Sequence, residues 1–368
     1  MKKPYRVLDA KQTGNGGRSL RDNLSRLVVG QDEAIEQIVN TYQMHVTGLA
    51  APGRPVGNFL FLGPTGSGKT RTVEATAEAL TGNPRAVIKI DCGELQHSHE
   101  IAKLIGSPPG YLGHRETHPL LSQEMLDQHH TETVKMSFVL FDEIEKASDA
   151  LWNLLLGILD KATLTLGDNR RVDFSRAMIF MTSNVGAAEM SALNAPKLGF
   201  QRHCGVEKRD ERLDTKMAQT GIAAARRKFT PEFMNRIDKI AVFKPLGEAE
   251  LGRVLDIELA QVQQRILTSS SGKFFALTVS ESGKRFLLEQ GTDVRYGARH
   301  LKRAIERLVV HPLSNLIATN QVNTGDWIEA DFDRIRKCLL FTMRTDGRAP
   351  NTVSRIIAEQ LRISTAAA

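Results

Sequence analysis

The stretch Gly63-Pro64-Thr65-Gly66-Ser67-Gly68-Lys69-Thr70 decides the fold of this chain. It matches the pattern G-x-x-x-x-G-K-[ST], in which glycines let backbone N–H groups curl around phosphate oxygens. The apolar run Phe59-Leu60-Phe61-Leu62 before it predicts a buried strand, and a helical pattern that runs to Leu80 follows it. This order predicts a nucleoside-triphosphate site, with Lys69 on the β- and γ-phosphates and the Thr70 hydroxyl on Mg²⁺.

Four further apolar runs alternate with helical or polar segments along the first two thirds of the chain. Strands are predicted at 86–91, 137–141, 177–181 and 240–243, besides 59–62, and a helix at about 149–160. Strands that alternate with helices favour parallel crossovers, so the expected fold class is α/β, a five-stranded parallel sheet covered on both faces. Ligands of such sheets bind at the carboxyl ends of the strands.

Polar side chains follow three of these predicted strands. The glycine loop follows the first strand, Asp142-Glu143 follows the third, and Asn184 ends the fourth. A carboxylate such as Asp142 can hold Mg²⁺, and the next carboxylate, Glu143, can polarise an attacking water. The amide of Asn184 can hold that water or the γ-phosphate without adding charge. Taken alone, each could be an ordinary loop acid or a capping amide, but the combination favours a catalytic site.

Two arginines are candidates for neutralising charge that develops during phosphoryl transfer. Arg236 follows Pro231-Glu232-Phe233-Met234-Asn235, and Arg299 follows Tyr296-Gly297-Ala298. A planar guanidinium suits a γ-phosphate. A single arginine is more often a surface residue, so the sequence pattern around each one has to decide.

Composition sets the broad class of the protein. The 368 residues suffice for two or three domains, and no run of eighteen apolar residues predicts a membrane span. The three cysteines, Cys92, Cys204 and Cys338, have no metal or disulfide spacing, which favours a reducing cytoplasm. The net charge of +7 permits a nucleic-acid partner, but 49 basic against 42 acidic residues is a mild excess.

Changes in composition indicate the domain boundaries. A flexible arm is expected at 1–19, because Gly14-Asn15-Gly16-Gly17 is glycine-rich, and a large domain at 20–244. Asp32 is the expected N-cap of a helix, and 187–227 is interpreted as an exposed loop followed by an amphipathic helix. A small domain at 245–343 and a tail at 344–368 follow; the small domain has helical patterns at 251–266 and 298–310 and strands at 274–279 and 337–341.

The chain resembles the Clp-type AAA+ ATPases, specifically the second ATPase domain and small domain of ClpA, ClpB and ClpC. The resemblance covers roughly residues 20–340, with its motifs in family order and a set too specific for chance. Besides the glycine loop, the stretches that carry it are Val29-Gly30-Gln31, Gly106-Ser107-Pro108-Pro109-Gly110-Tyr111-Leu112-Gly113, Leu140 to Ala147, Met181 to Gly186, Pro231 to Asp238 and Arg295-Tyr296-Gly297-Ala298-Arg299.

The resemblance implies a P-loop AAA+ αβα domain, a small and mainly helical C-terminal α+β domain, and a ring of six subunits with ATP and Mg²⁺. It places adenine near Val28 and Val29. Arg236 is similar to the arginine finger that enters a neighbour's site, Arg299 to the sensor arginine of the small domain, and Asn184 to the polar sensor. Tyr111 would line an axial pore and grip unfolded polypeptide through apolar contact.

One tripeptide concerns a protein partner, the ClpP peptidase. Leu198-Gly199-Phe200 lies where ClpA and ClpC carry a hydrophobic-Gly-hydrophobic segment that docks on the ClpP peptidase; it could equally pack on its own domain. The expected function is an ATP-dependent unfoldase or chaperone, cytoplasmic and homo-oligomeric, that acts on unfolded or tagged proteins. The alternatives are a stand-alone ClpB-like remodelling chaperone, a non-hydrolysing nucleotide switch, and a DNA-acting motor, although no nucleic-acid module is recognisable.

Overall fold

The computed structural model describes residues 9, 12–107, 119–194, 211–269, 272–292 and 297–344. The chain divides into two compact units, residues 1–245 and 246–368, and each unit is described by itself. No helix in the described part of the chain combines the length and the apolar run that crossing a bilayer requires.

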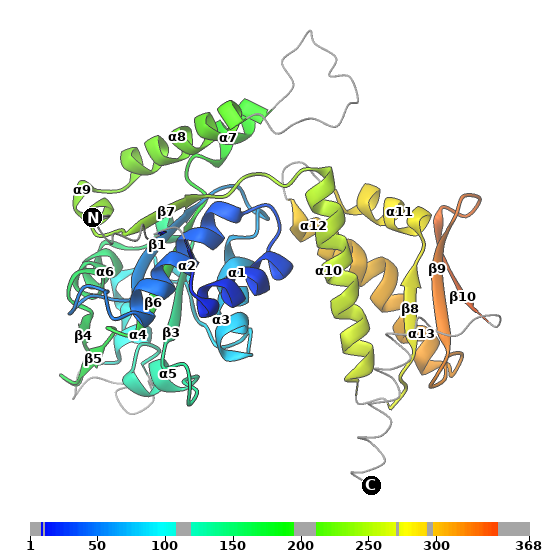
Figure 1. The fold of residues 1–368 in the computed structure, drawn as a ribbon, viewed down its shortest axis with the longest axis horizontal. Helices are drawn as coiled ribbons and strands as arrows, with labels where there is room; N and C mark the ends of the chain where they lie inside the picture. The colour runs from blue at the N-terminus through cyan, green and yellow to red at the C-terminus, as the bar shows by residue number, and fades with distance from the viewer. Residues whose placement is uncertain are drawn as a thin grey trace, which may run out of the picture. The chain divides into compact units, whose positions relative to one another are not determined.

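The first unit is built on a sheet of five parallel strands (Figure 1), as the sequence predicts. Its order is β2-β3-β6-β1-β7, so β1 lies inside the sheet between β6 and β7. Because every pairing in it is parallel, the carboxyl ends of all five strands meet at one edge. The strands are β1 (Gly57–Leu62), β2 (Ile88–Asp91), β3 (Ser137–Asp142), β6 (Ala177–Ser183) and β7 (Lys239–Val242).

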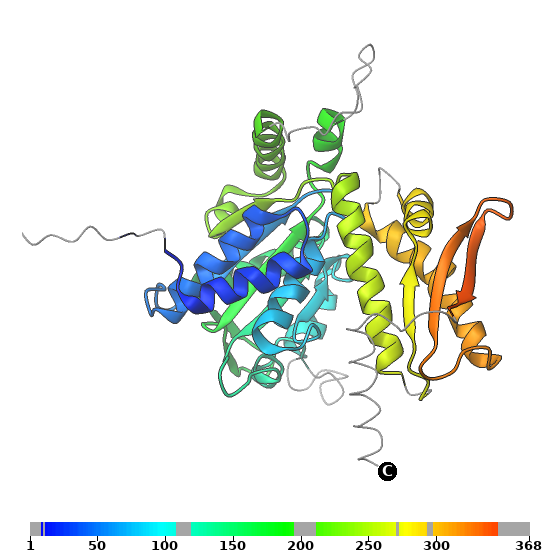
Figure 2. The same ribbon diagram turned by 45° about the vertical axis from the view of Figure 1, so that its right-hand side comes forward.

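Successive side chains of β1 point to opposite faces of the sheet, and apolar side chains on both faces explain why helices cover both. Phe59 and Phe61 belong to one core cluster, with side chains from α1, α2 and α3, whereas Leu60 and Leu62 belong to a second, with side chains from α6 and α8. All four are fully buried. Figure 2 shows α1 (Asn15–Leu27) and α2 (Asp32–Val46) side by side over the sheet, near α3 (Lys69–Thr81). The second face is covered chiefly by α6 (Asp149–Lys161) and α8 (Glu211–Lys228).

Two expectations about the amino-terminal region are wrong. Helix α1 begins at Asn15, inside the glycine-rich segment assigned to the arm. Gly17 is buried there, and a Cβ on it would lie 2.6 Å from a Thr13 methyl carbon and 3.0 Å from Gln43 Oε1 of α2, so a glycine fits this close contact of α1 with α2. Asp32 is the first residue of α2 rather than its N-cap, which is Gln31.

The remaining elements of the first unit are short. Residues 187–194, expected in a loop, form helix α7, whereas the amphipathic helix expected next is α8. A hairpin of β4 and β5, which the sequence analysis did not predict, follows α6. The bounds are η1 (Cys92–Glu94), η2 (Ser98–Ile101), α4 (Ala102–Ile105), α5 (Gln123–Asp127), η3 (Ile144–Lys146), β4 (Thr163–Thr165), β5 (Arg171–Asp173), α7 (Ala187–Asn194) and α9 (Pro231–Met234).

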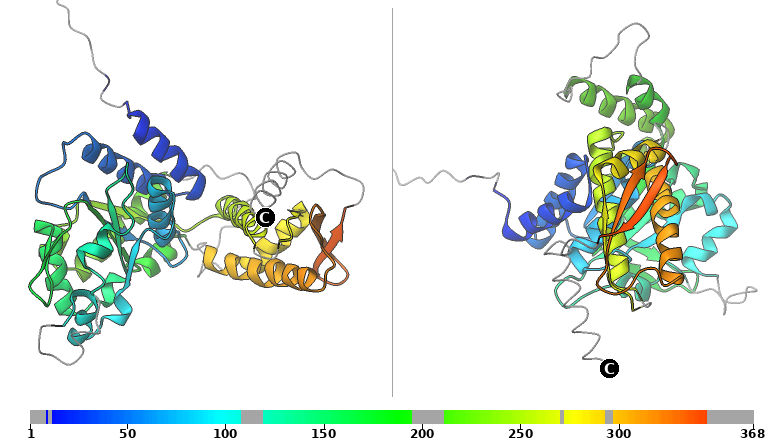
Figure 3. Two further views of the ribbon diagram at one scale, coloured as in Figure 1. Left: turned by 90° about the horizontal axis from the view of Figure 1, so that it is seen from below. Right: turned by 90° about the vertical axis from the view of Figure 1, so that its right-hand side faces the viewer.

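The second unit packs helices around a three-stranded sheet of order β10-β9-β8. The predicted strands correspond to β8 (Ala276–Val279) and β10 (Cys338–Met343), but the central strand β9 (Trp327–Asp333) was not predicted. The helix expected to end at 310 continues without a break (Figure 3). It runs from α12 (Ala298–Ile305) through a π-helical segment at 306–310 to α13 (His311–Ala318). Helices α10 (Glu248–Leu267) and α11 (Glu281–Gly291) complete the mainly helical unit.

Candidate active site

The glycine loop joins the end of β1 to the start of α3. Gly66 and Gly68 have left-handed backbones, with φ of 78° and 100°, and Gly63 has φ of 152°. A Cβ at Gly63 would lie 2.5 Å from the Phe243 carbonyl oxygen, so the close approach of these backbones requires glycine. The loop therefore delivers its N–H groups and the amino end of a 13-residue helix to one point, the arrangement that binds phosphate.

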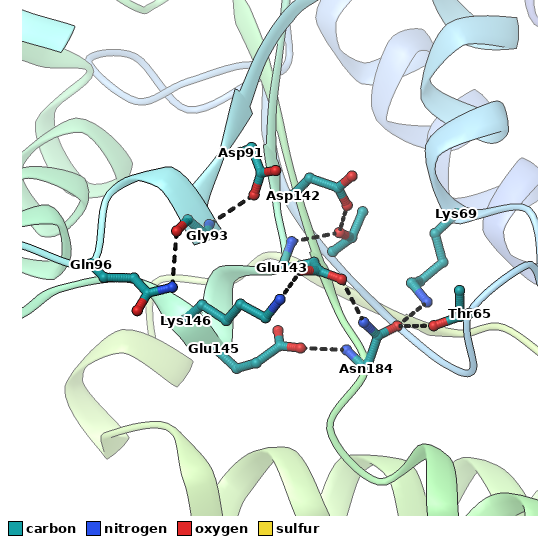
Figure 4. A network of polar contacts seen from close by, with 11 residues as sticks. Thr65, Lys69, Asp91, Gly93, Gln96, Asp142, Glu143, Glu145, Lys146 and Asn184 are labelled. Carbon is teal, nitrogen blue, oxygen red and sulfur yellow. Dashed lines mark hydrogen bonds and ion pairs between the residues drawn. The ribbon is translucent and has the colours of Figure 1, made fainter. Parts of the chain in front are cut away.

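Lys69 connects this loop to the adjacent strand. The side chain is buried, and its Nζ donates to the carbonyl oxygens of Gly63 at 2.6 Å and Pro64 at 2.9 Å. It also donates to Asn184 Oδ1 at 2.9 Å, as Figure 4 shows. The lysine of the loop and the amide at the end of β6 are thus brought together, as their places at neighbouring strand ends predict.

A threonine that the sequence analysis did not single out holds the acidic pair. Thr182 on β6 donates its hydroxyl to Asp142 Oδ1 and accepts the N–H of Glu143 at 3.1 Å. Glu143 has φ of 56°, a left-handed conformation that costs about 1 kcal/mol in a residue with a side chain. The bond from Thr182 helps to hold that strained turn, from which the Glu143 carboxylate reaches the amide of Asn184. Position 182 is marked in the sequence only as a polar residue that ends an apolar strand.

Glu143 is held from two sides. Its Oε1 accepts a hydrogen bond from Asn184 Nδ2 at 3.3 Å, and its Oε2 pairs with Lys146 Nζ. The contact with Glu143 raises the pKa of Lys146. The neighbouring Glu145 accepts the backbone N–H of Asn184 at 3.1 Å. A continuous polar chain therefore runs from Lys69 through Asn184 to Glu143 (Figure 4), and Glu145 and Lys146 support it.

The residues present fit a magnesium–triphosphate group. Gly68 is left-handed, and a Cβ built on it would meet nothing within 4 Å, so there is open space beside the loop at this residue. Lys69 supplies a cation, and Asp142 and Thr70 supply oxygens. Magnesium takes only one or two protein oxygens beside phosphates and waters, so these two residues suffice to hold it.

The segment assigned to adenine lies against the loop. Val28 and Val29 are buried between α1 and α2. Gln31, two residues on, donates its amide to the carbonyl oxygens of Ser67 and Lys244, both at 3.1 Å. Gln31 also accepts the N–H of Lys244 at 3.2 Å. These bonds connect the segment of Val28 and Val29 with the glycine loop and with Lys244, which follows β7.

Arg236 lies at the opposite edge of the sheet. It precedes β7, which is parallel to β1, so it lies beyond the amino ends of the strands. Its Nη1 donates to the Glu232 carbonyl at 2.9 Å, and its Nη2 lies 3.3 Å from Glu232 Oε1 and 3.9 Å from Asp160 Oδ2. The six residues of β1, about 20 Å of extended strand, separate it from the loop of its own chain.

The other predicted site residues belong to the second unit or to segments outside the described residues. Arg299 is exposed in the first turn of α12, in the second unit. Tyr111 and the tripeptide Leu198-Gly199-Phe200 lie outside the described residues, as does the tail beyond Arg344.

Comparisons with known proteins agree with this geometry. The family described as AAA domain (Cdc48 subfamily) matches residues 54–240, and the C-terminal, D2-small domain of ClpB protein matches residues 246–330. The chaperone protein ClpB of Bdellovibrio bacteriovorus is 38% identical over 312 residues, which are 84% of this chain and 33% of that protein. The ATP-binding subunit ClpC of the ATP-dependent Clp protease of Staphylococcus saprophyticus is 37% identical over 319 residues, 86% of this chain and 36% of ClpC.

Solved structures give the same result for the fold. A closed-state reconstruction of Hsp104 with ATPγS and FITC casein has a TM-score of 0.72 at 30% identity, covering 88% of this chain and 51% of that one. An extended complex of S. cerevisiae Hsp104 with casein has a TM-score of 0.73 at 28% identity, covering 90% and 53%. The chain spans about a third of the length of the curated relatives it matches.

Proposed function

The chain belongs to the AAA ATPases of the Clp type, and we propose that it hydrolyses ATP in a ring of identical subunits and uses the energy to unfold polypeptides. The polar chain from Lys69 through Asn184 to Glu143 is the observation that carries the proposal. It aligns a phosphate-binding cation, a neutral amide and a carboxylate at the end of a glycine loop, the set that phosphoryl transfer to water requires.

Each residue has a distinct part in the reaction. Lys69 and the loop N–H groups would bind the β- and γ-phosphates, and Thr70 and Asp142 would hold Mg²⁺, which would neutralise phosphate charge. Val28 and Val29 supply an apolar surface for adenine. Glu143 accepts a proton from the attacking water at its carboxylate, and the Asn184 amide fixes the orientation of that carboxylate.

The position of Arg236 is the reason for proposing a ring. A guanidinium at the amino edge of the sheet cannot reach the loop at the carboxyl edge of the same subunit, but it can enter the site of a neighbour. A contact between two different edges of identical subunits is heterologous, and such contacts generate closed rings when the rotation closes. We propose six subunits, as the Clp-type resemblance implies, with Arg299 as a second phosphate-sensing arginine.

A subunit-mixing experiment tests the ring. Adding an excess of subunits that carry both Glu143→Gln and Arg236→Ala to the unaltered protein should suppress ATP turnover, because each such subunit has no catalytic carboxylate of its own and leaves a neighbour's site without an arginine. The measurement is phosphate release at constant unaltered protein, with oligomer size followed by light scattering. A protein that stays monomeric in saturating ATP, with turnover indifferent to the added subunits, would contradict the proposal.

Polypeptide is the proposed substrate, because casein is named with Hsp104 in both similar structures. Tyr111 is the proposed pore residue.

A ClpP-type peptidase is the proposed partner of Leu198-Gly199-Phe200, and similarity to ClpC supports it. Deleting the tripeptide should abolish degradation of a tagged reporter by a ClpP-type peptidase while leaving unfolding intact.

We also propose a cytoplasmic location. Cys92, Cys204 and Cys338 lie far apart in the sequence and lack disulfide spacing, which suits a reducing compartment.

A further inference from the structure

A buried amide occupies an unusual place at the amino edge of the sheet. Asn58 is the second residue of β1, in a strand otherwise made of glycine and large apolar residues, and it is fully buried. Its Nδ2 donates to the Leu159 carbonyl at 3.1 Å and to the Arg236 carbonyl at 3.1 Å. The two amide protons are thereby both used, while Oδ1 has no hydrogen-bond partner among the described residues.

An apolar residue would be the ordinary choice here. A buried amide with an unpaired oxygen is unfavourable by an amount comparable to a lost hydrogen bond, so stability of the strand alone does not explain it. The orientation of the amide is also determined, because a flipped side chain would place Oδ1 against two carbonyl oxygens. What the amide achieves is a connection between the strand, the last turn of α6 and the backbone of Arg236.

Further bonds make this connection rigid. The Asn58 N–H donates to Asp238 Oδ2 at 2.9 Å, and the Asp238 N–H donates to the Asn58 carbonyl at 3.0 Å. Arg54 lies 3.3 Å from the other oxygen of Asp238. Residues 236–238 are therefore bonded to one position of β1 by three hydrogen bonds, which fixes the position of the Arg236 backbone just before the start of β7.

The α6 connection also orients the guanidinium. Leu159, whose carbonyl accepts from Asn58, is one of the last residues of α6 and has no later helical turn to pair with. Its neighbour Asp160 lies 3.9 Å from Arg236 Nη2. The same amide thus holds both the backbone of the arginine and the helix end that carries a carboxylate beside its side chain.

We propose, on the basis of the trans role of Arg236, that Asn58 is a positioning residue for the ATP site of the neighbouring subunit. Asn58 lies near the amino end of β1, at the other end of the strand from the glycine loop of its own subunit, and it fixes the place from which Arg236 reaches across. A displacement of about 1 Å at a charge-stabilising group can lower turnover about 10²-fold, so loosening this connection should be visible in rate.

The test uses complementation between full-length subunits. Asn58→Leu removes both donors at similar size, and alone it should lower kcat about 10²-fold with KM for ATP nearly unchanged. Mixed with Glu143→Gln subunits, which cannot hydrolyse but still offer an intact Arg236, it should regain turnover well above the sum of the two separate proteins. Each restored site then has its own Glu143 and a neighbour's correctly placed arginine.

Two controls make the outcomes distinct. Ser137 is likewise buried at the amino edge, at the start of β3, and donates to a helix carbonyl, that of Leu126, at 2.8 Å. Ser137→Ala should keep normal kcat, because that bond does not involve Arg236. The pair Arg236→Ala with Glu143→Gln should complement; if it does not, the trans role itself fails.

Results that overturn the inference are equally clear. If the Arg236→Ala pair complements and the Asn58→Leu pair does not, Asn58 acts only on its own domain, and the inference is wrong. Unchanged kcat in Asn58→Leu alone would also reject it. Should Asn58→Leu be insoluble, Asn58→Ser replaces it, since the shorter hydroxyl cannot reach both carbonyls, and the same two outcomes apply.

Discussion

At the scale of single residues, Glu143 is the proposed base that acts on the attacking water. The Asn184 amide and the Lys146 ammonium hold its two oxygens, and its left-handed backbone is bonded to Thr182. Glu143→Gln should therefore bind ATP with nearly unchanged affinity but lower turnover about 10²–10⁴-fold, the usual contribution of a general base. Phosphate release and titration with a fluorescent nucleotide measure the two quantities, and near-normal turnover would remove Glu143 from this role.

Cys92 permits a chemical check of the same region. Burial, followed by the charges of Asp91 and Asp142, raises the pKa of the Cys92 thiol far above its ordinary value. The thiolate is the nucleophile, so the folded protein should resist alkylation at Cys92 throughout the mildly alkaline range. Cys338 is exposed on β10 and should react under the same conditions. Peptide mapping after iodoacetamide treatment reads out both, and modification of Cys92 at the rate of Cys338 would contradict the buried position.

At the scale of elements, a glycine contact joins two helices of the second unit. A Cβ at Gly291, the last residue of α11, would lie 2.7 Å from the Leu301 Cα of α12. Gly291→Ala should destabilise this unit by about 1–3 kcal/mol, because overpacking outweighs the smaller gain in helix propensity. Gly252→Ala is the matched control, since a Cβ at Gly252 on α10 meets nothing within 4 Å, and it should stabilise by about 0.5–1 kcal/mol.

Hydrogen exchange of residues 281–305 measures this prediction locally, which matters because a chain of two units need not unfold in one step. Faster exchange is expected for Gly291→Ala, and unchanged or slower exchange for Gly252→Ala. Equal exchange in both variants would mean that α11 and α12 accommodate the added methyl group without a loss of stability.

The elements also show where sequence reasoning succeeds and where it stops. The five strands of the large sheet were predictable because buried parallel strands are nearly continuous apolar runs, as Phe59 to Leu62 illustrates. Strand β9 was missed because only Ile328 and Ala330 are buried, between polar residues. Helix α1 was placed too late because glycines at 16 and 17 suggest a coil, whereas packing of Leu20 and Leu24 continues the helix through them.

The residues of the candidate site were likewise predictable only in part. Residues that directly follow apolar strands, such as Asp142 and Asn184, could be predicted from their position alone. Their supports could not: Glu145 reaches Asn184, and Thr182 reaches Asp142, across neighbouring strands. Such contacts depend on the order of strands in the sheet, which no local pattern contains. Asn58 has even less of a signal, since a single polar residue in an apolar run marks no function.

At the scale of the whole molecule, the proposed pore separates ATP hydrolysis from unfolding. Tyr111 lies outside the described residues, and its role is a proposal from its glycine- and proline-rich sequence motif. Tyr111→Ala should keep ATP turnover within about twofold and lose about tenfold or more in unfolding, because an aromatic grips a passing chain by apolar contact. Unfolding of a tagged fluorescent reporter is the measurement. Tyr111→Phe is the control and should retain activity, while full unfolding by the alanine variant would refute the pore role.

The strand β1 sets a distance that matters for the proposed ring. Asn58 is bonded near one end of it and Gly63 follows the other, and ladders to β6 and β7 prevent the strand from sliding or stretching. In the proposed ring, the length of β1 therefore sets the distance between a subunit's own glycine loop and the arginine that it contributes to the next subunit. A residue inserted between Asn58 and Gly63 would misalign successive sites around the circle even if every side chain that contacts nucleotide were retained.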